Sequence, residues 1–172
     1  MAIEKTLVIF KPDAVGRGIV GEITTRFERA GLKIVATKML DPDYDQYYHH
    51  YENIGKMISR RGKPAFDTTL TMMKMSPVIA FILEGVDAVS LVRKMVGATD
   101  PKNALPGTIR GDYAHMGFAH ADEQEIGIPN LLHASGDADE AKLEIAHWFS
   151  ETEIHSYSIS HEKFTQPNEK KN

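Results

Sequence analysis

Asn130-Leu131-Leu132-His133-Ala134-Ser135-Gly136-Asp137 is the stretch of the sequence that decides the fold. The apolar pair Leu131 and Leu132 is typical of the end of a strand. The small residues that follow favour a tight turn, and Ser135 is a good helix-capping residue. The pattern therefore predicts a buried strand that carries His133 to the start of a helix.

The residues after this stretch predict that helix. Between Asp137 and Phe149 apolar residues recur at helical spacing, and acidic residues crowd the first turn, where the helix dipole favours negative charge. Glu144 lies two turns inside the helix. A carboxylate behind an imidazole fixes the tautomer of the ring and stabilises positive charge on it, so Glu144 is the expected partner of His133. The alternative is a purely structural histidine at a strand end.

Composition limits the possible classes of protein. A chain of 172 residues and 19.2 kDa suits one domain, 1–172, that needs no disulfides, and it contains no cysteine. The longest apolar run, Pro77–Leu83, is far shorter than the roughly 20 residues of a membrane-spanning helix, so we expect a cytoplasmic protein with no membrane partner. A net charge of -4 argues against nucleic-acid binding but allows a local basic pocket.

The order of the elements indicates the fold class. Strands are expected at 6–10, 32–40 and 77–85 and helices at 19–30, 65–75 and 88–96, before the strand and helix already described. The segment 102–129 reads as a long loop in which Pro106–Asp112 presents Arg110 to solvent, and the tail from 150 is polar. This order suits an α+β sandwich whose antiparallel sheet carries helices on one face.

Other candidate site residues are open to two interpretations. Lys11 ends the first strand beside a proline, where it either is solvated or meets a phosphate. His49 and His50 point to different faces of a helix, which favours surface or packing roles over metal binding. The basic group at 60–63 and the tyrosines before it could line an anion pocket and stack a base. His115 and His120 lack the carboxylates that would complete a metal site.

Four blocks of the sequence resemble, in the correct order, the blocks of nucleoside diphosphate kinases. The similarity runs from about Lys5 to Phe149, and four ordered blocks are far more specific than any one of them. The resemblance implies a ferredoxin-like βαββαβ fold with a four-stranded antiparallel sheet. It also implies that the γ-phosphate of a nucleoside triphosphate passes to a histidine and then to a nucleoside diphosphate, with Mg²⁺ bridging the phosphates. The blocks are Thr6–Val15, Gly18–Ile23, Pro106–Asp112 and Asn130–Ser135.

The resemblance also assigns residues to roles. His133 matches the phosphorylated nucleophile, Glu144 the glutamate that holds its other ring nitrogen, and Ser135 the serine beside it. Neutral imidazole, with an ordinary pKa of about 6.5, needs no general base near pH 7. Phosphoryl transfer requires mainly positioning and cations around the phosphate oxygens. The positions that match the family's phosphate, sugar and transferring-group contacts are Lys11, Tyr51, Arg93, Thr99, Arg110 and Asn130.

The sequence departs from the family pattern in three places. Ala65 stands where the family has its base-stacking phenylalanine, so Phe66 is a candidate replacement and weaker base stacking is expected. Ala134 and Gly136 replace the usual glycine and aspartate after the histidine, leaving Asp137 as a candidate to position magnesium-bound water. Insertions near 52–63 and 113–129 flank the expected nucleotide cleft, and the second leaves Pro129 where the family has an arginine.

Family members assemble as tetramers or hexamers built from a common dimer, with the loop Pro101–Arg110 in subunit contacts. The resemblance therefore implies a homo-oligomer. A rival hypothesis is a non-catalytic nucleotide-binding regulatory protein on the same fold, for which the altered base and magnesium positions would be the motive. The retained His133, Lys11 and Glu144 favour the kinase, because a binding module needs no nucleophile.

Overall fold

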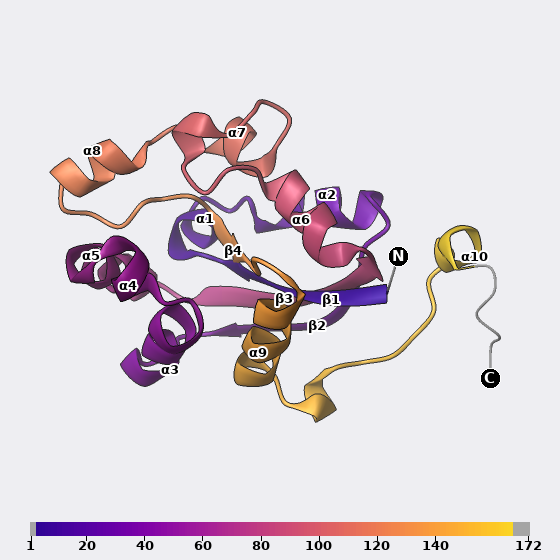
Figure 1. The fold of residues 1–172 in the computed structure, drawn as a ribbon. Helices are drawn as coiled ribbons and strands as arrows, with labels where there is room; N and C mark the ends of the chain where they lie inside the picture. Colours follow the sequence, from indigo (N-terminus) through magenta and orange to yellow (C-terminus); the bar gives the residue numbers. More distant parts are fainter. Residues whose placement is uncertain (1–2, 167–172) are drawn as a thin grey trace.

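The computed structural model describes residues 3–166, and its centre is one four-stranded sheet (Figure 1). The strands are β1 (Ile3–Phe10), β2 (Lys33–Leu40), β3 (Val78–Val86) and β4 (Leu132–Ala134), in the order β2-β3-β1-β4. Each neighbouring pair is antiparallel. The α+β, ferredoxin-like fold class expected from the sequence is confirmed. The last residues of the polar tail, 167–172, lie outside the described residues.

Helices cover both faces of the sheet, so the expectation that they lie on one face is wrong (Figure 1). Residues 6–10 of β1 are all buried, and successive side chains point to opposite faces. Leu7 and Ile9 pack against α3 (Tyr44–Tyr48), α5 (Lys63–Met73) and α9 (Ala138–Trp148). Val8 and Phe10 pack against α2 (Val20–Arg29) and α6 (Ala88–Val96). A continuous apolar strand is what burial from both sides requires.

The expected long loop after α6 contains short helices. One effect is that Arg110 lies in a helix and is only 6% exposed, so the expectation of an arginine presented to solvent is wrong. The remaining helices are α1 (Pro12–Gly16), the π-helix η1 (His49–Ile54), α4 (Met57–Arg61), the 3-10 helix η2 (Pro101–Asn103), α7 (Ile109–Tyr113), α8 (Phe118–Glu123), the 3-10 helix η3 (Glu151–Glu153) and α10 (Glu162–Thr165).

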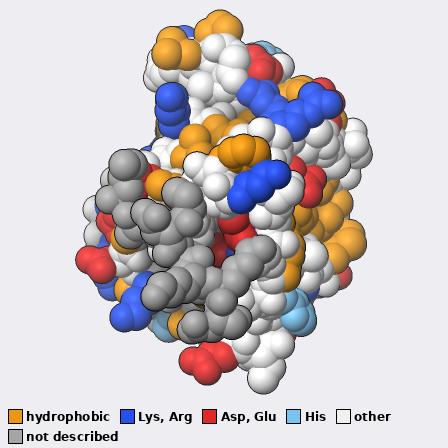
Figure 2. All heavy atoms as spheres, turned by 90° about the vertical axis from the view of Figure 1, so that its right-hand side faces the viewer, with side chains coloured by type: hydrophobic (Ala, Val, Ile, Leu, Met, Phe, Trp, Pro, Cys, Tyr) orange, Lys and Arg blue, Asp and Glu red, His pale blue; other side chains and the backbone are white. Residues whose placement is uncertain are grey.

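Residues 150–166, which we name the C-terminal strap, lie along β2 at the edge of the sheet. The backbone N–H of His155 donates to the carbonyl oxygen of Val35 at 2.8 Å. Lys33 forms ion pairs with Glu162 of the strap at 2.8 Å and with Glu84 of β3 at 2.7 Å. On the face of the molecule seen in Figure 2, coloured basic and acidic side chains are interspersed. Within residues 3–166 no helix is long and apolar enough to cross a membrane.

Candidate active site

His133 lies in β4 directly opposite Ile9 of β1. Paired residues of an antiparallel sheet share a face, so His133 lies on the same face as Ile9, which is the face covered by α9 and η1. Leu132 and Ala134 on either side of it point to the other face and pack in the second hydrophobic cluster. This alternation fixes the position of the imidazole, which remains 19% exposed.

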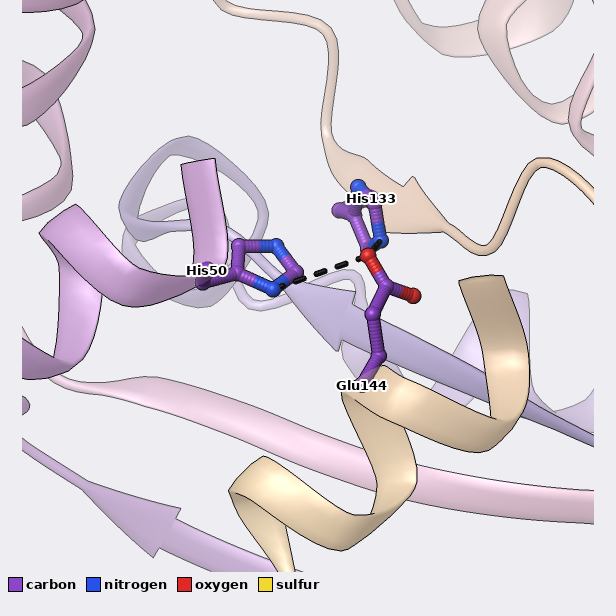
Figure 3. Close-up of side chains that lie close together, drawn as sticks. All are labelled: His50, His133 and Glu144. Atoms are coloured by element: carbon purple, nitrogen blue, oxygen red, sulfur yellow. Dashed lines mark ion pairs between the residues drawn. The ribbon is translucent and has the colours of Figure 1, made fainter. Parts of the chain in front are cut away.

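Glu144 reaches His133 from α9, as the sequence predicted (Figure 3). The Nε2 atom of His133 lies 2.8 Å from Oε1 of Glu144, although the ring N–H does not point straight at that oxygen. The fully buried Ser135 hydroxyl donates to Oε2 at 2.6 Å and accepts from the backbone N–H of Leu7. Burial alone would raise the pKa of Glu144, but His133, His50 and Ser135 outweigh it and lower the pKa to about 2. The carboxylate is therefore charged throughout the physiological range.

His50 is the functional neighbour that sequence reasoning missed. Its Nδ1 lies 3.6 Å from Oε1 of Glu144, and its ring lies edge-on to that of His133 with centroids 4.5 Å apart (Figure 3). Trp148 Nε1 donates to this Nδ1 at 3.2 Å. Burial and the neighbouring His133 hold the pKa of His50 well below its usual value. His50 therefore takes up a proton less readily than an exposed histidine does.

The trio of His50, His133 and Glu144 also has ligand atoms close enough for a metal ion. Trp148, however, already occupies the Nδ1 lone pair of His50, the atom nearest the carboxylate. The contacts fit a positioning network better than a metal centre. The role of His50 could not be predicted from a local sequence pattern, because it depends on how η1 packs against α9.

Lys11 and Asn130 lie together beside β4. The Lys11 ammonium donates to Oδ1 of Asn130 at 2.7 Å, and the Asn130 amide donates to the carbonyl oxygen of Thr99 at 2.8 Å. Burial and the nearby Arg110 lower the pKa of Lys11 to about 8. The backbone N–H of Leu131, a residue with φ of 72°, donates to Asp13 Oδ2. These contacts fix three expected site residues from three separate segments of the chain.

Arg110 is held by backbone carbonyl groups. Its Nε donates to Asn130 at 3.1 Å, and its two terminal nitrogens donate to Gly97 at 3.1 Å and Leu132 at 2.6 Å. Burial and the charge of Arg93 lower the pKa of Arg110 to about 10, so it still carries its charge at neutral pH. The guanidinium is therefore a fixed cation at the end of β4.

A cavity of about 600 Å³ joins these groups. Such a volume is in the range of small-molecule sites. Ser135 does not line it, because its hydroxyl lies beneath Glu144. The expected site residues that do line it are Lys11, Tyr51, Arg93, Thr99, Arg110, Asn130, His133 and Glu144.

Phe66 does not line the cavity, which corrects its assignment as a nucleotide-binding residue. Its ring is 1% exposed and packs edge-on against Tyr48, with centroids 5.7 Å apart. One helical position separates it from Ala65, which does line the cavity. A step of one residue rotates a side chain by about 100°, which takes Phe66 into the core.

Acidic side chains lie at the start of α9, where the family's aspartate is missing. The Asp137 carboxylate caps the helix by accepting from the backbone N–H of Glu140 at 2.8 Å. Glu140 in turn accepts from the backbone N–H of Gly136. Asp137, Asp139 and Glu140 all line the cavity. The carboxylates at this end of the cavity thus follow Gly136, which stands at the position of the family's aspartate, by one to four residues.

Comparisons of the sequence with known proteins identify the family of this chain. The family model described as "Nucleoside diphosphate kinase" matches residues 4–154. The nucleoside diphosphate kinase of Borreliella burgdorferi is 42% identical over 157 residues, covering 91% of this chain and 93% of that protein. That of Pyrococcus furiosus is 46% identical over 157 residues, covering 90% and 88%.

A solved structure is also similar to this chain. It is the transition state mimic of the Borrelia burgdorferi nucleoside diphosphate kinase with bound vanadate and ADP. It superimposes with a TM-score of 0.91 at 40% identity, covering 95% of this chain and 96% of that one. Because the sequence match spans most of the chain and the fold agrees, this protein belongs to the nucleoside diphosphate kinase family.

Proposed function

We propose that His133 is the residue that carries the phosphoryl group in the nucleoside diphosphate kinase reaction of this chain. The observation that carries the proposal is the contact between Glu144 and Nε2 of His133 at 2.8 Å, at the wall of a cavity. The contact leaves Nδ1 as the ring nitrogen available to a phosphate. Its lone pair attacks the γ-phosphorus, the bond to the bridging oxygen breaks, and the nucleoside diphosphate leaves. An incoming nucleoside diphosphate reverses these steps.

The cations around the cavity supply the electrostatic part of catalysis. Lys11 and Arg110 are fixed by hydrogen bonds, so they need little reorganisation as charge develops on the phosphate oxygens. Arg93 is exposed at the end of α6, and it also lines the cavity. Tyr51, Thr99 and Asn130 line the same cavity, and the resemblance assigns them to contacts with the sugar and phosphates.

Mg²⁺ is proposed as the cation that accompanies the nucleotide. The donor set fits this ion, because it is bound through substrate phosphates, waters and one or two carboxylates, and Asp137 and Asp139 line the cavity with carboxylate oxygens. When bound, the ion neutralises charge on the phosphates. Asp137 would hold its hydration shell with the oxygen that does not cap α9.

We also propose a homo-oligomer, a tetramer or hexamer built from dimers, that works in the cytoplasm, where nucleoside di- and triphosphates are available. The resemblance to the family supports the assembly. Leu105, 73% exposed on the loop Pro101–Arg110, supports it further, because a large apolar side chain gains by being covered.

Labelling with γ-³²P-ATP and Mg²⁺ tests the role of His133. After removal of nucleotide, we expect an acid-labile, alkali-stable label on the protein that GDP discharges. His133→Ala should lose the label completely, and His120→Ala, which changes an exposed histidine outside the cavity, should retain it. Label that survives in His133→Ala would show that another residue is the nucleophile. Absence of label on the wild type would favour the non-catalytic nucleotide-binding protein.

A further inference from the structure

The cavity contains an aromatic ring that the family resemblance does not assign. Ala65 offers no ring and Phe66 is buried in the core, but Phe118 of α8 lines the cavity. Phe118 belongs to the second insertion, near 113–129. The ring therefore comes from a part of the chain that has no counterpart in the family blocks found in the sequence.

The two insertions meet at this ring. Arg61 of α4, in the first insertion, lies over Phe118 with its Cζ atom 3.6 Å from the ring centroid. Its guanidinium also lies 3.4 Å from the carboxylate of Asp122, one turn further along α8. Figure 1 shows α4 and α8 on the same side of β4. We name the pair α4 (Met57–Arg61) and α8 (Phe118–Glu123) the clasp.

The clasp is fixed to the body of the protein. Ala121 and Ile128 are buried, and the chain between them passes so close to α5 that a Cβ atom at Gly127 would lie 2.7 Å from both Met72 Cβ and the carbonyl oxygen of Thr68. In the first insertion, Gly62 with φ of 87° joins α4 directly to α5. Both halves of the clasp are thus attached to α5.

One cavity connects the clasp with the nucleophile. Arg61, Phe118 and Asp122 line the same cavity as His133 and Lys11. Apolar side chains of the insertion, Ile126 and Ile128, line it as well. The cavity therefore has a cationic part suited to phosphates and a part with a flat, apolar and aromatic wall.

We infer that the nucleobase lies against the flat surface formed by Phe118 and Arg61, so that the two insertions together form the base-binding subsite. The inference rests on the proposed function, because it takes the nucleotide phosphates to lie at His133. A base stacks on aromatic rings and on the guanidinium plane of arginine alike, and such stacking tolerates different bases. The clasp replaces the ring that Ala65 lacks, so the expected weakening of base stacking is removed.

Calorimetric titration of the full-length protein with ADP and with inorganic tripolyphosphate tests the inference. Tripolyphosphate carries phosphates but no base. Stacking on an aromatic side chain corresponds to about five- to 150-fold in affinity when the side chain is cut to alanine. Phe118→Ala should therefore weaken ADP binding by about tenfold or more and leave tripolyphosphate binding unchanged. Arg61→Lys should also weaken ADP selectively, because a lysine cannot lie flat on the ring.

Phe164→Ala is the matched control. This phenylalanine is 74% exposed in α10, outside the cavity, and it too has a cation over its ring, Lys163 at 4.8 Å. Its replacement should change neither titration. Phe118→Leu distinguishes loss of the ring from loss of packing, and it should bind ADP as weakly as Phe118→Ala.

Several outcomes would overturn the inference. Unchanged ADP affinity in Phe118→Ala would do so, and so would an equal loss for ADP and tripolyphosphate, which would mean that the ring shapes the phosphate end. Failure of the proposed function appears elsewhere, as a wild-type protein that takes no label from ATP. A base-selective loss of ADP binding would support the subsite even then.

Discussion

Glu144 is a buried carboxylate that contacts the imidazole ring of His133, and we expect it to orient that ring. It is 1% exposed and engages His133 and Ser135 with different oxygens. Glu144→Ala should lower kcat by about ten- to 100-fold, a loss usual for a group that orients a working histidine. The Kd for ADP should stay nearly unchanged, because an orienting residue acts mainly on the transition state. Stopped-flow measurement of phosphoryl transfer beside equilibrium titration separates the two effects. A parallel loss of affinity would argue against this role.

The lowered pKa of Lys11 predicts that kcat/KM depends on pH. Burial and Arg110 lower its pKa from 10.5 to about 8, so the free enzyme loses this charge as pH rises through 8 instead of near 10.5. The value of kcat/KM should be highest below pH 8 and fall by up to about tenfold per unit above it. A profile measured from pH 6.5 to 9.5 checks the sign. Lys11→Arg, which stays charged, should remove the decline, and a wild-type profile that is flat to pH 9.5 would contradict the assignment.

At the scale of elements, a substitution at Gly127 tests whether the second insertion packs against α5. A methyl group there would collide with Met72 and Thr68 of α5. Gly127→Ala should lower the free energy of unfolding by about 1–3 kcal/mol, as overpacking in a buried site does. It should also weaken ADP binding, because α8 carries Phe118. Gly16→Ala is the control, since a Cβ atom at Gly16 meets nothing within 4 Å. Chemical denaturation measures both variants, and equal stability of the two would refute the docking contact.

Elements with a strong local pattern could be predicted from the sequence. The apolar run of β1 and the periodicity of α9 are local properties. β1 begins three residues before its expected start, and α9 lies within one residue of its expected ends. The position of Glu144 behind His133 followed from helical spacing and from the resemblance. The insertions could not be predicted in this way. The helices α4 and α8 have five and six residues, too short to show a periodicity.

Contacts between distant segments were likewise beyond the sequence. Phe66 was the expected aromatic residue because it is adjacent to Ala65, but helical rotation buries it. Phe118 is more than fifty residues away and lines the cavity, where Arg61 lies over its ring and the segment after α8 packs against α5 at Gly127. His50 was interpreted as a surface or packing residue, and its packing is against His133 itself.

At the scale of the whole molecule, the proposed assembly predicts the behaviour of Leu105. Sedimentation equilibrium should give a mass four or six times that of the 19.2 kDa chain. Leu105→Asp places a charge on the exposed loop and should reduce this assembly to smaller species, because burying an unpaired charge is costly. Leu143→Asp, a matched change at another exposed leucine, should leave the mass unchanged. A wild-type mass of one chain would contradict the proposed oligomer.

The pairing of Ile9 with His133 joins residues separated by most of the chain. During synthesis β1 emerges well before β4 and already carries the apolar side chains of an inner strand, yet β4, its neighbour on one side, follows more than 120 residues later. Contacts of such long range slow folding, and an open strand edge favours pairing with other chains. Nascent or truncated chains that stop before β4 should therefore depend strongly on chaperones. His133 and the strand that covers this edge of β1 are therefore synthesised together.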